Sequence, residues 1–423
     1  MLLVSQIREQ FEQVLAGLKK RNLTNAEEIL NQAVALDDLR KSSQAQRDQL
    51  QAEANSLAKQ IGQLMKEGKS AEANQTKERT GEIKQQIKEL DDQNTKAEAD
   101  LKALLYTLPN VPHTSVPAGK SAEDNEVVLS HGEIPTLFEG KLPHWELIKK
   151  YDIIDFDLGV KITGAGFPVY KGKGARLQRA LINFFLDEAI AAGYIEVQPP
   201  ILVNEDSGYG TGQLPDKEGQ MYHATVDNLY LIPTAEVPIT NLYRDVILNE
   251  SDLPIRNVGY TPCFRREAGS WGAHVRGLNR LHQFDKVELV QITHPDQSYE
   301  TLENMSTYVQ SLLQKLELPY RVLRLCGGDM GFTSALTYDM EVYSAAQERW
   351  LEVSSVSNFE TYQTNRLKLR FRGEDKKTQL AHSLNGSGLA LPRIVASILE
   401  NNQTPDGIMM PKVLHPYLGF DKI

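Results

Sequence analysis

Apolar positions at the start of the chain repeat with the spacing of helices. Residues 4–20 place five apolar side chains on one helical face: Ile7, Phe11, Val14, Leu15 and Leu18. This pattern predicts an amphipathic helix. Residues 1–108 contain no proline, and no aromatic residue lies between Phe11 and Tyr106. Such a composition is typical of long helices.

Two longer segments follow, in which apolar residues are separated alternately by four and three positions. The first seam contains Leu50, Ala54, Leu57, Ile61 and Leu64, and the second contains Ile83, Ile87, Leu90, Asn94, Ala97, Leu101 and Leu104. Four-three spacing is the heptad pattern of coiled coils. Residues 67–70 between the seams have the composition of a turn. We therefore expect residues 1–108 to form a helical arm built on an antiparallel coiled coil.

The pattern changes abruptly at residues 108–125, where three prolines in a short run indicate a linker. From residue 136 the chain has a mixed α/β pattern. Residues 174–194 have apolar positions at helical spacing, and residues 195–203 predict a strand bent at Pro199 and Pro200. We predict a fold of the α+β class, with an arm (1–108), a linker (109–135) and a core (136–423). An ordinary helix and strand explain residues 174–203 equally well at this stage.

Residues 258–291 carry the richest pattern of polar chemistry. They predict two strands, 258–267 and 280–291, joined by a loop that contains Gly269, Gly272 and Gly277. In the second strand, side chains alternate between the two faces with a period of two residues, so Phe284 and Glu288 fall on the same face. Four arginines lie on or beside the loop: Arg265, Arg266, Arg276 and Arg280. Arginine offers paired donors for phosphate, although a solvated hairpin with surface arginines would show the same pattern.

Composition limits the classes of protein that the chain can represent. The chain has 423 residues, a formal net charge of −10, 41% hydrophobic residues and 24% charged residues. These values are typical of a globular protein and argue against indiscriminate nucleic-acid binding. Cys263 and Cys326 are the only cysteines, which excludes a disulfide framework and a cysteine zinc cluster. The sequence has no apolar run long enough for a signal peptide or a membrane span, and we expect a cytoplasmic protein.

Three further stretches carry weaker signals. Thr234 and Glu236 follow a short predicted strand and can bind an ammonium group, although they can equally cap a helix. Glu352 and Ser355 offer oxygen ligands that suit Mg²⁺. Residues 381–403 predict a strand, a glycine turn at Gly386 and Gly388, and a helix with Pro392 in its first turn.

Taken together and in order, these stretches resemble the three sequence motifs of the class II aminoacyl-tRNA synthetases, in the form found in seryl-tRNA synthetases. Residues 174–203 are similar to motif 1, residues 258–291 to motif 2 and residues 381–403 to motif 3. The resemblance covers nearly the whole chain. It implies a core with a mostly antiparallel sheet flanked by helices, and a homodimer formed through residues 174–203.

The resemblance also implies roles for individual residues. Arg265 and Arg280 would be the catalytic residues. ATP would be bound by Arg265, Arg266, Glu267, Leu281, Phe284, Glu352, Val353, Ser354, Ser355 and Arg393. Serine would be bound by Thr234, Ala235, Glu236, Arg265, Glu288, Asn385 and Ser387. Mg²⁺ would be bound by Glu352 and Ser355.

By the same resemblance, the helical arm would bind tRNA(Ser), and also tRNA(Sec) in hosts that have it. The arm's charge favours a different interpretation, because residues 37–100 hold eleven Lys or Arg and thirteen Asp or Glu. A structural or protein-binding coiled coil fits that balance. For the chain as a whole, a class II-type amino acid ligase with a non-tRNA acceptor and a regulatory relative without activity also stay open.

Overall fold

The computed structural model describes residues 1–216, 218–267 and 276–423. The chain divides into two compact units. One comprises residues 2–19 and 23–109, and the other comprises Met1, residues 20–22 and residues 110–423. We call the first the arm and the second the core. Among the described helices, none combines the length and apolarity needed to cross a membrane.

The arm begins with two short helices where the sequence predicts one. The prediction of a single helix over residues 4–20 is wrong, because α1 (Val4–Glu9) ends at Gln10 and α2 (Phe11–Lys20) begins immediately after it. Gln10 has φ −130° and ψ 37°, which is not a helical conformation. The apolar face survives this break, since Ile7, Val14 and Leu18 are all buried.

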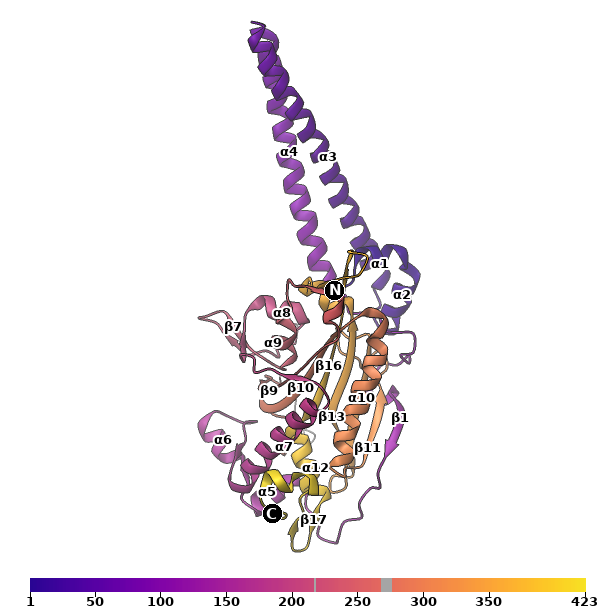
Figure 1. Ribbon diagram of the computed structural model, residues 1–423, viewed down its shortest axis with the longest axis vertical. Coiled ribbons are helices and arrows are strands. Elements are labelled where there is room, and N and C mark those ends of the chain that lie inside the picture. Colours follow the sequence, from indigo (N-terminus) through magenta and orange to yellow (C-terminus); the bar gives the residue numbers. More distant parts are fainter. Residues whose placement is uncertain (217, 268–275) are drawn as a thin grey trace. The chain divides into compact units, whose positions relative to one another are not determined.

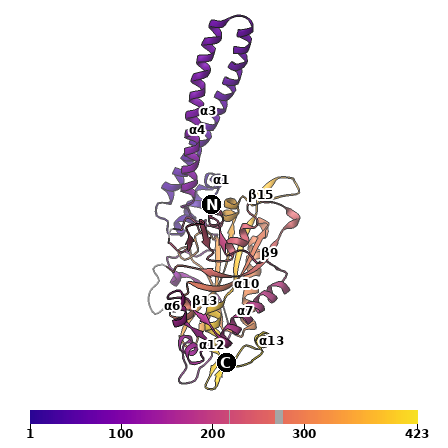
Figure 2. The same ribbon diagram turned by 90° about the vertical axis from the view of Figure 1, so that its left-hand side faces the viewer.

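Two long helices, α3 (Ala26–Lys66) and α4 (Ser70–Leu105), form the antiparallel hairpin that the heptads predict (Figure 1). Figure 2 shows the short turn that joins the two helices. Ala54, Ile83 and Ala97 are buried between them. Polar pairs also cross the seam, such as Ser43 Oγ, which donates to Gln93 Oε1 at 3.1 Å. Asn94 interrupts the seam, and its buried Oδ1 has no hydrogen-bond partner among the described residues.

The core is built on an eight-stranded sheet in the order β1-β11-β12-β13-β16-β10-β9-β4. Neighbouring strands are antiparallel except for β4 and β9. The strands are β1 (Glu126–His131), β4 (Ile195–Glu196), β9 (Ile255–Phe264), β10 (Gln283–Thr293), β11 (Tyr320–Arg324), β12 (Leu336–Ser344), β13 (Arg349–Glu360) and β16 (His382–Ala390). This arrangement confirms the predicted α+β class.

Long helices cover the sheet and bury the main apolar core against it (Figure 1). They are α7 (Gly172–Ala191), α10 (Ser298–Lys315) and α12 (Leu391–Asn401). A second apolar cluster joins Val290 and Ile292 of β10 to Ile239 and Phe371. Strand β10 is therefore buried over most of its length, and polar side chains on it need partners inside the protein.

Shorter elements complete the core. The helices are α5 (His144–Lys150), α6 (Phe156–Ile162), α8 (Glu205–Thr211), α9 (Glu236–Asn241), α11 (Thr361–Leu367) and α13 (His415–Leu418). The strands are β2 (Ile154–Asp155), β3 (Val169–Tyr170), β5 (Leu202–Val203), β6 (His223–Ala224), β7 (Leu229–Leu231), β8 (Ile247–Asn249), β14 (Arg370–Arg372), β15 (Thr378–Leu380), β17 (Gln403–Thr404) and β18 (Gly407–Ile408).

Two predictions about the core are wrong in detail. Residues 195–203 form two strands in different sheets, because β4 pairs with β9 whereas β5 pairs with β7. Gly386 and Gly388 do not form a turn but lie within β16. Their role is close packing: a Cβ on Gly386 would lie 3.2 Å from Met305 Cε, and one on Gly388 would lie 3.2 Å from Val287 Cγ1.

Candidate functional site

Neighbouring strands at the centre of the sheet bring distant parts of the sequence together. Glu288 of β10 lies opposite Ser387 of β16, and Val356 of β13 lies opposite Gly386. On its other side, Glu288 lies opposite Gly259 of β9. The predicted site residues of motifs 2 and 3 therefore share one region of the sheet, because the register aligns them.

Buried polar side chains cluster around Glu288, which is itself fully buried, and we call this cluster the pocket. Lys286, two residues earlier on the same strand, forms an ion pair with Glu288 and donates to Thr234 Oγ1 at 2.9 Å. Thr234 Oγ1 in turn donates to Glu288 Oε2 at 3.0 Å, and Asn385 Nδ2 donates to Glu288 Oε1 at 3.3 Å. A buried charge is tolerated only when it is paired and hydrogen-bonded, and this network meets both conditions.

Glu236 is the second carboxyl group of this pocket. Burial, together with the negative charge of Glu288, raises the pKa of Glu236 to about 7. Gln363 of α11 donates to Glu236 Oε1 at 2.6 Å, and Ser383 Oγ donates to Gln363 Oε1 at 2.8 Å. The pocket thus holds two acidic side chains, and the positive charges of Lys286 and Arg265 both act to lower the pKa of Glu236. An added ammonium group would favour the ionised form of Glu236 further.

Of the two predicted catalytic arginines, Arg265 lies beside the pocket. Arg265 donates from Nε to Pro233 O at 3.4 Å, and its guanidinium lies over the Phe284 ring at 5.2 Å. This cation–π contact orients the guanidinium. Arg280 forms an ion pair with Glu267, which has φ 49°. Arg280, which the resemblance makes a catalytic residue, therefore contacts Glu267, which the resemblance assigns to ATP.

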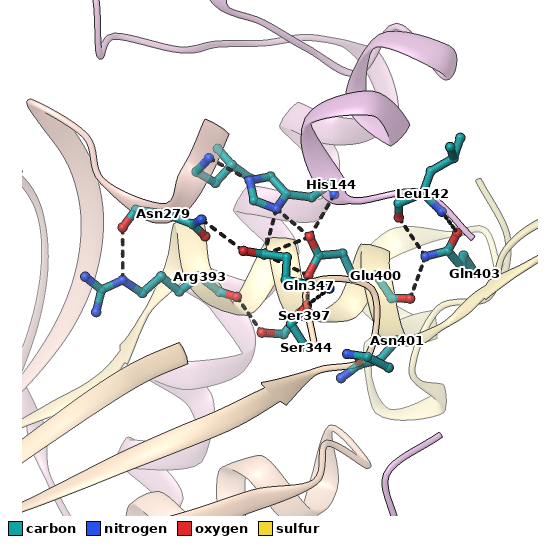
Figure 3. A network of polar contacts seen from close by, with 12 residues as sticks. Leu142, His144, Asn279, Ser344, Gln347, Arg393, Ser397, Glu400, Asn401 and Gln403 are labelled. Atoms are coloured by element: carbon teal, nitrogen blue, oxygen red, sulfur yellow. Dashed lines mark hydrogen bonds and ion pairs between the residues drawn. The ribbon is translucent and has the colours of Figure 1, made fainter. Parts of the chain in front are cut away.

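Arg393 lies in the first turn of α12, which begins after Ala390 and has Pro392 in its first turn as predicted. Its Nη1 donates to Glu352 O at 2.7 Å. Its Nε donates to Asn279 O at 3.2 Å (Figure 3). The second contact joins motif 3 to the middle of motif 2. The first joins it to β13, where Glu352 is exposed.

Oxygen ligands suitable for a divalent cation gather where β12 and β13 pair. Asp339 lies opposite Ser355, and Glu352 is three residues before Ser355. Burial raises the pKa of Asp339 well above its ordinary value, and the charge of Glu352 adds to that effect. Oδ1 of Asp339 is buried without a hydrogen-bond partner in the described structure. Among all the residues that the structure describes, no group of three or more His, Cys, Asp or Glu side chains is placed to hold a metal.

The remaining predicted site residues differ in how far they are exposed and in what they contact. Arg266 is exposed, and its backbone N donates to Gln220 O at 2.8 Å. Leu281, Val353 and Ala235 are buried, so a ligand would contact their backbone. Ser354 Oγ donates to Ser387 O at 2.6 Å and links β13 to β16. Gly269 and Gly272 lie outside the described residues, whereas Gly277 has φ 66° and requires a glycine conformation.

Three site residues were missed by the sequence analysis. Lys286 has a detectable signal, because the period of two that selects Phe284 and Glu288 also selects the position between them. Asp339 and Gln363 have no such signal. Asp339 reaches Ser355 only through the pairing of β12 with β13, and Gln363 reaches Glu236, 127 residues away in sequence, only through the packing of α11.

Comparison with known proteins defines the class of the chain. The tRNA synthetase class II core domain (G, H, P, S and T) matches residues 221–402, and the seryl-tRNA synthetase N-terminal domain matches residues 1–112. Together with the antiparallel sheet and the three motifs, the first match defines a class II aminoacyl-tRNA synthetase core.

Full-length relatives narrow this assignment. The chain is 51% identical over 425 residues to a serine–tRNA ligase of Salinibacter ruber, and the match covers 100% of this chain and 99% of the relative. The chain is also 48% identical over 425 residues to a serine–tRNA ligase of Akkermansia muciniphila, and the match covers 100% of this chain and 99% of that relative. The crystal structure of seryl-tRNA synthetase from Pyrococcus horikoshii complexed with ATP is 33% identical, with a TM-score of 0.94 over 100% of this chain and 99% of that one. The chain belongs to the seryl-tRNA synthetase family, whose members are ATP-dependent ligases, and the predicted resemblance is confirmed.

The buried ion pair of the pocket leads to a prediction about stability. Replacing Lys286 with Met removes the cation that is paired with Glu288, and losing one partner of a buried pair costs about 3–5 kcal/mol. Without Lys286 the pKa of Glu236 rises further above its unfolded value, so its ionisation opposes folding as the pH rises. We expect denaturant unfolding to show a larger loss of stability at pH 8 than at pH 5.5. Replacement of the exposed Lys161 serves as the control, and equal losses at both pH values would contradict the prediction.

Proposed function

We propose that this protein activates L-serine with ATP to form seryl-adenylate and transfers serine to the 3′ end of tRNA(Ser). The convergence of Thr234, Glu236 and Glu288 in one buried pocket beside Arg265 carries this proposal. A pocket with two carboxyl groups, a hydroxyl and a neighbouring guanidinium matches a small amino acid with an ammonium, a hydroxyl and a carboxylate.

Serine recognition in this proposal divides between two sets of groups. Thr234 and Glu236 hold the ammonium group, and the backbone of Ala235 between them lines the pocket. Glu288, Asn385 and Ser387 hold the hydroxyl. Glu288 and Ser387 face each other across β10 and β16, which supports a common ligand atom. Because buried polar groups are left unpaired without the hydroxyl, alanine and glycine are rejected, by as much as ~10⁴–10⁵ in comparable sites.

ATP lies over motif 2 in this proposal. Arg265 bridges the α-phosphate and the serine carboxylate, and Arg280 holds the γ-phosphate. Glu267 accepts from the adenine amino group, so the ion pair between Glu267 and Arg280 opens when the nucleotide binds. Phe284 and Arg393 enclose the adenine ring. The backbones of Arg266, Leu281, Val353 and Ser354 complete the nucleotide site.

Mg²⁺ is assigned to Glu352 and Ser355. Carboxylate and hydroxyl oxygens are donors that Mg²⁺ accepts, and the carboxyl group of Asp339 lies opposite Ser355 on the neighbouring strand. The ion would neutralise charge on the phosphates. The donor set therefore fits the cation.

Catalysis in this scheme requires no nucleophilic side chain. The serine carboxylate attacks the α-phosphorus in line, the bond to the bridging oxygen breaks, and pyrophosphate leaves. The protein contributes position and charge: Arg265 aligns both reactants, and Arg280 stabilises the departing phosphates. The tRNA 3′-terminal hydroxyl then attacks the seryl carbonyl and releases AMP.

The helical arm is proposed to bind the tRNA, with tRNA(Sec) as a second acceptor in hosts that have it. We retain residues 1–108, 109–135 and 136–423 as the functional domains. Homodimerisation through residues 174–203 is supported by exposed aliphatic side chains, since Ile190, Ile195 and Leu202 are 47%, 66% and 42% exposed. A second copy of this surface would bury them. A cytoplasmic location is also proposed, in keeping with two free cysteine thiols.

A ligase with a non-tRNA acceptor would perform the same activation step but would give no role to the helical arm. Both functions are tested first by serine-dependent exchange of labelled pyrophosphate into ATP without tRNA. We expect exchange with serine and little with threonine, alanine, cysteine or glycine. We also expect Arg265→Ala to abolish exchange while keeping a wild-type circular dichroism spectrum. Normal exchange in that folded variant would refute the assigned role of Arg265.

The pKa of Glu236 predicts how serine binding depends on pH. The ammonium group binds the ionised carboxylate, and a pKa raised to about 7 means that this form is lost as the pH falls from 8 to 6. We expect the KM for serine in pyrophosphate exchange to rise over this range, by at most about tenfold per pH unit. In Glu236→Gln the KM should be raised but should no longer vary with this titration. An unchanged pH profile in that variant would assign the dependence to another group.

The role of the arm is tested by removing residues 37–100, which lie in the arm unit and leave the core intact. We expect wild-type rates of serine-dependent pyrophosphate exchange, because every proposed ligand of serine and ATP lies in the core. We expect a strong loss of tRNA charging, visible as a raised KM for tRNA. If the deletion variant charges tRNA at the wild-type rate, the arm does not bind tRNA and has only a structural role.

A further inference from the structure

Helix α5 begins with a buried histidine that takes no part in the scheme above. His144 is fully buried within a polar network (Figure 3). The network joins α5, α12, the turn between β12 and β13, and residues 278–279 in the middle of motif 2. Figure 3 shows its members meeting around the Glu400 side chain. Such a network is costly to bury, so its geometry is informative.

The hydrogen bonds of His144 define how its ring is protonated. Its backbone N and ring Nδ1 both donate to Glu400 Oε1, at 2.8 and 2.7 Å. Its Nε2 accepts from the backbone N of Leu278 at 2.8 Å. The proton therefore resides on Nδ1, and Nε2 is free to accept. The ring therefore bridges Glu400 on α12 and the backbone of Leu278, and it holds that backbone in place.

Residues 276–279 are held against α5 by more than this bond. The Arg276 guanidinium lies over the Trp145 ring at 5.0 Å. Gly277 packs so closely that a Cβ there would lie 2.3 Å from His144 Nε2. Leu278 is 1% exposed in the main core. These contacts act on consecutive residues shortly before Arg280.

The same network also reaches Arg393. Gln347 Nε2 donates to both oxygens of Glu400, at 2.9 and 3.0 Å. Gln347 Oε1 accepts from Asn279 Nδ2 at 3.1 Å. Asn279 O in turn accepts from Arg393 Nε at 3.2 Å. Leu278 and Asn279 are therefore fixed from two directions, and their fixed backbone supports one arginine of motif 2 and one of motif 3.

We propose that His144 is a positioning residue for the nucleotide: through its bond to Leu278 it fixes the backbone from which Arg280 extends and to which Arg393 is bonded. This inference rests on the proposed function, because it assigns these arginines to ATP. His144 touches no substrate. Sites that recognise phosphates need their donors held to within about 0.5 Å, and a long arginine side chain gains that precision only from a fixed backbone.

Two amide substitutions separate the bonds that His144 makes. In His144→Asn, the side-chain amide occupies the place of Nδ1, so the contact with Glu400 is kept and the acceptor for Leu278 is lost. In His144→Gln, the longer side chain brings its carbonyl oxygen to the place of Nε2 and keeps the acceptor. The matched control is His415→Asn, because His415 lies in the same unit and its Nε2 contacts the backbone oxygen of Met410, at 3.0 Å, instead of motif 2.

The test measures serine-dependent pyrophosphate exchange, calorimetric ATP binding and hydrogen–deuterium exchange at the Leu278 amide. In His144→Asn we expect faster amide exchange and a KM for ATP raised up to about tenfold, which corresponds to the net free energy of one hydrogen bond. The KM for serine and the melting temperature should stay close to wild type. His144→Gln should restore the KM for ATP, and His415→Asn should leave all readouts unchanged.

Two results would overturn the proposal. A wild-type KM for ATP in His144→Asn, despite faster exchange at Leu278, shows that the position of this backbone does not affect the nucleotide. Equal rises in both KM values together with a lower melting temperature assign His144 a purely structural role. If the wild-type enzyme fails to exchange pyrophosphate with serine, the proposed function falls, whereas ATP binding and amide exchange in the same variants still decide the role of His144.

Discussion

The site depends on the ion pair between Lys286 and Glu288 inside the sheet. Two charges on one strand, two residues apart, lie where apolar side chains would otherwise pack. Their burial is sustainable only because Thr234, Asn385 and the neighbouring strand β16 supply hydrogen bonds. This requirement fixes the register of β10 against β16, and that register in turn sets Ser387 opposite Glu288. Under the proposed function, the contacts that stabilise the sheet here would also recognise serine.

The rest of the site is arranged around this pair by elements that are distant in sequence. Motif 3 returns through β16 into α12, which brings Arg393 to the backbone of Asn279. Strand β13 brings Glu352 to Arg393, and α11 brings Gln363 to Glu236. Each of these groups extends from a regular strand or helix. A site of this kind is preorganised, and catalysis by position and charge requires that property.

Much of this architecture could be predicted from the sequence, since heptads specify the hairpin of α3 and α4 and alternation specifies β9 and β10. The failures have physical causes. Gly386 and Gly388 suggest a turn, but they serve to bring strands and helices close together within β16. Residues 195–203 resemble one strand because local composition does not show that β4 and β5 pair with different partners. Asp339 and Gln363 are identifiable only from tertiary pairing.

The contact between Glu267 and Arg280 has a consequence for the entry and exit of a nucleotide. In this structure the two side chains neutralise each other, with Arg280 half exposed to solvent. Under the proposed roles a nucleotide must break this ion pair, because Glu267 would bind the adenine amino group and Arg280 would bind the γ-phosphate. Breaking the pair would use part of the binding energy of ATP. Because adenine stays bound as the adenylate, Glu267 would stay occupied after pyrophosphate leaves, and the ion pair would return only when AMP departs.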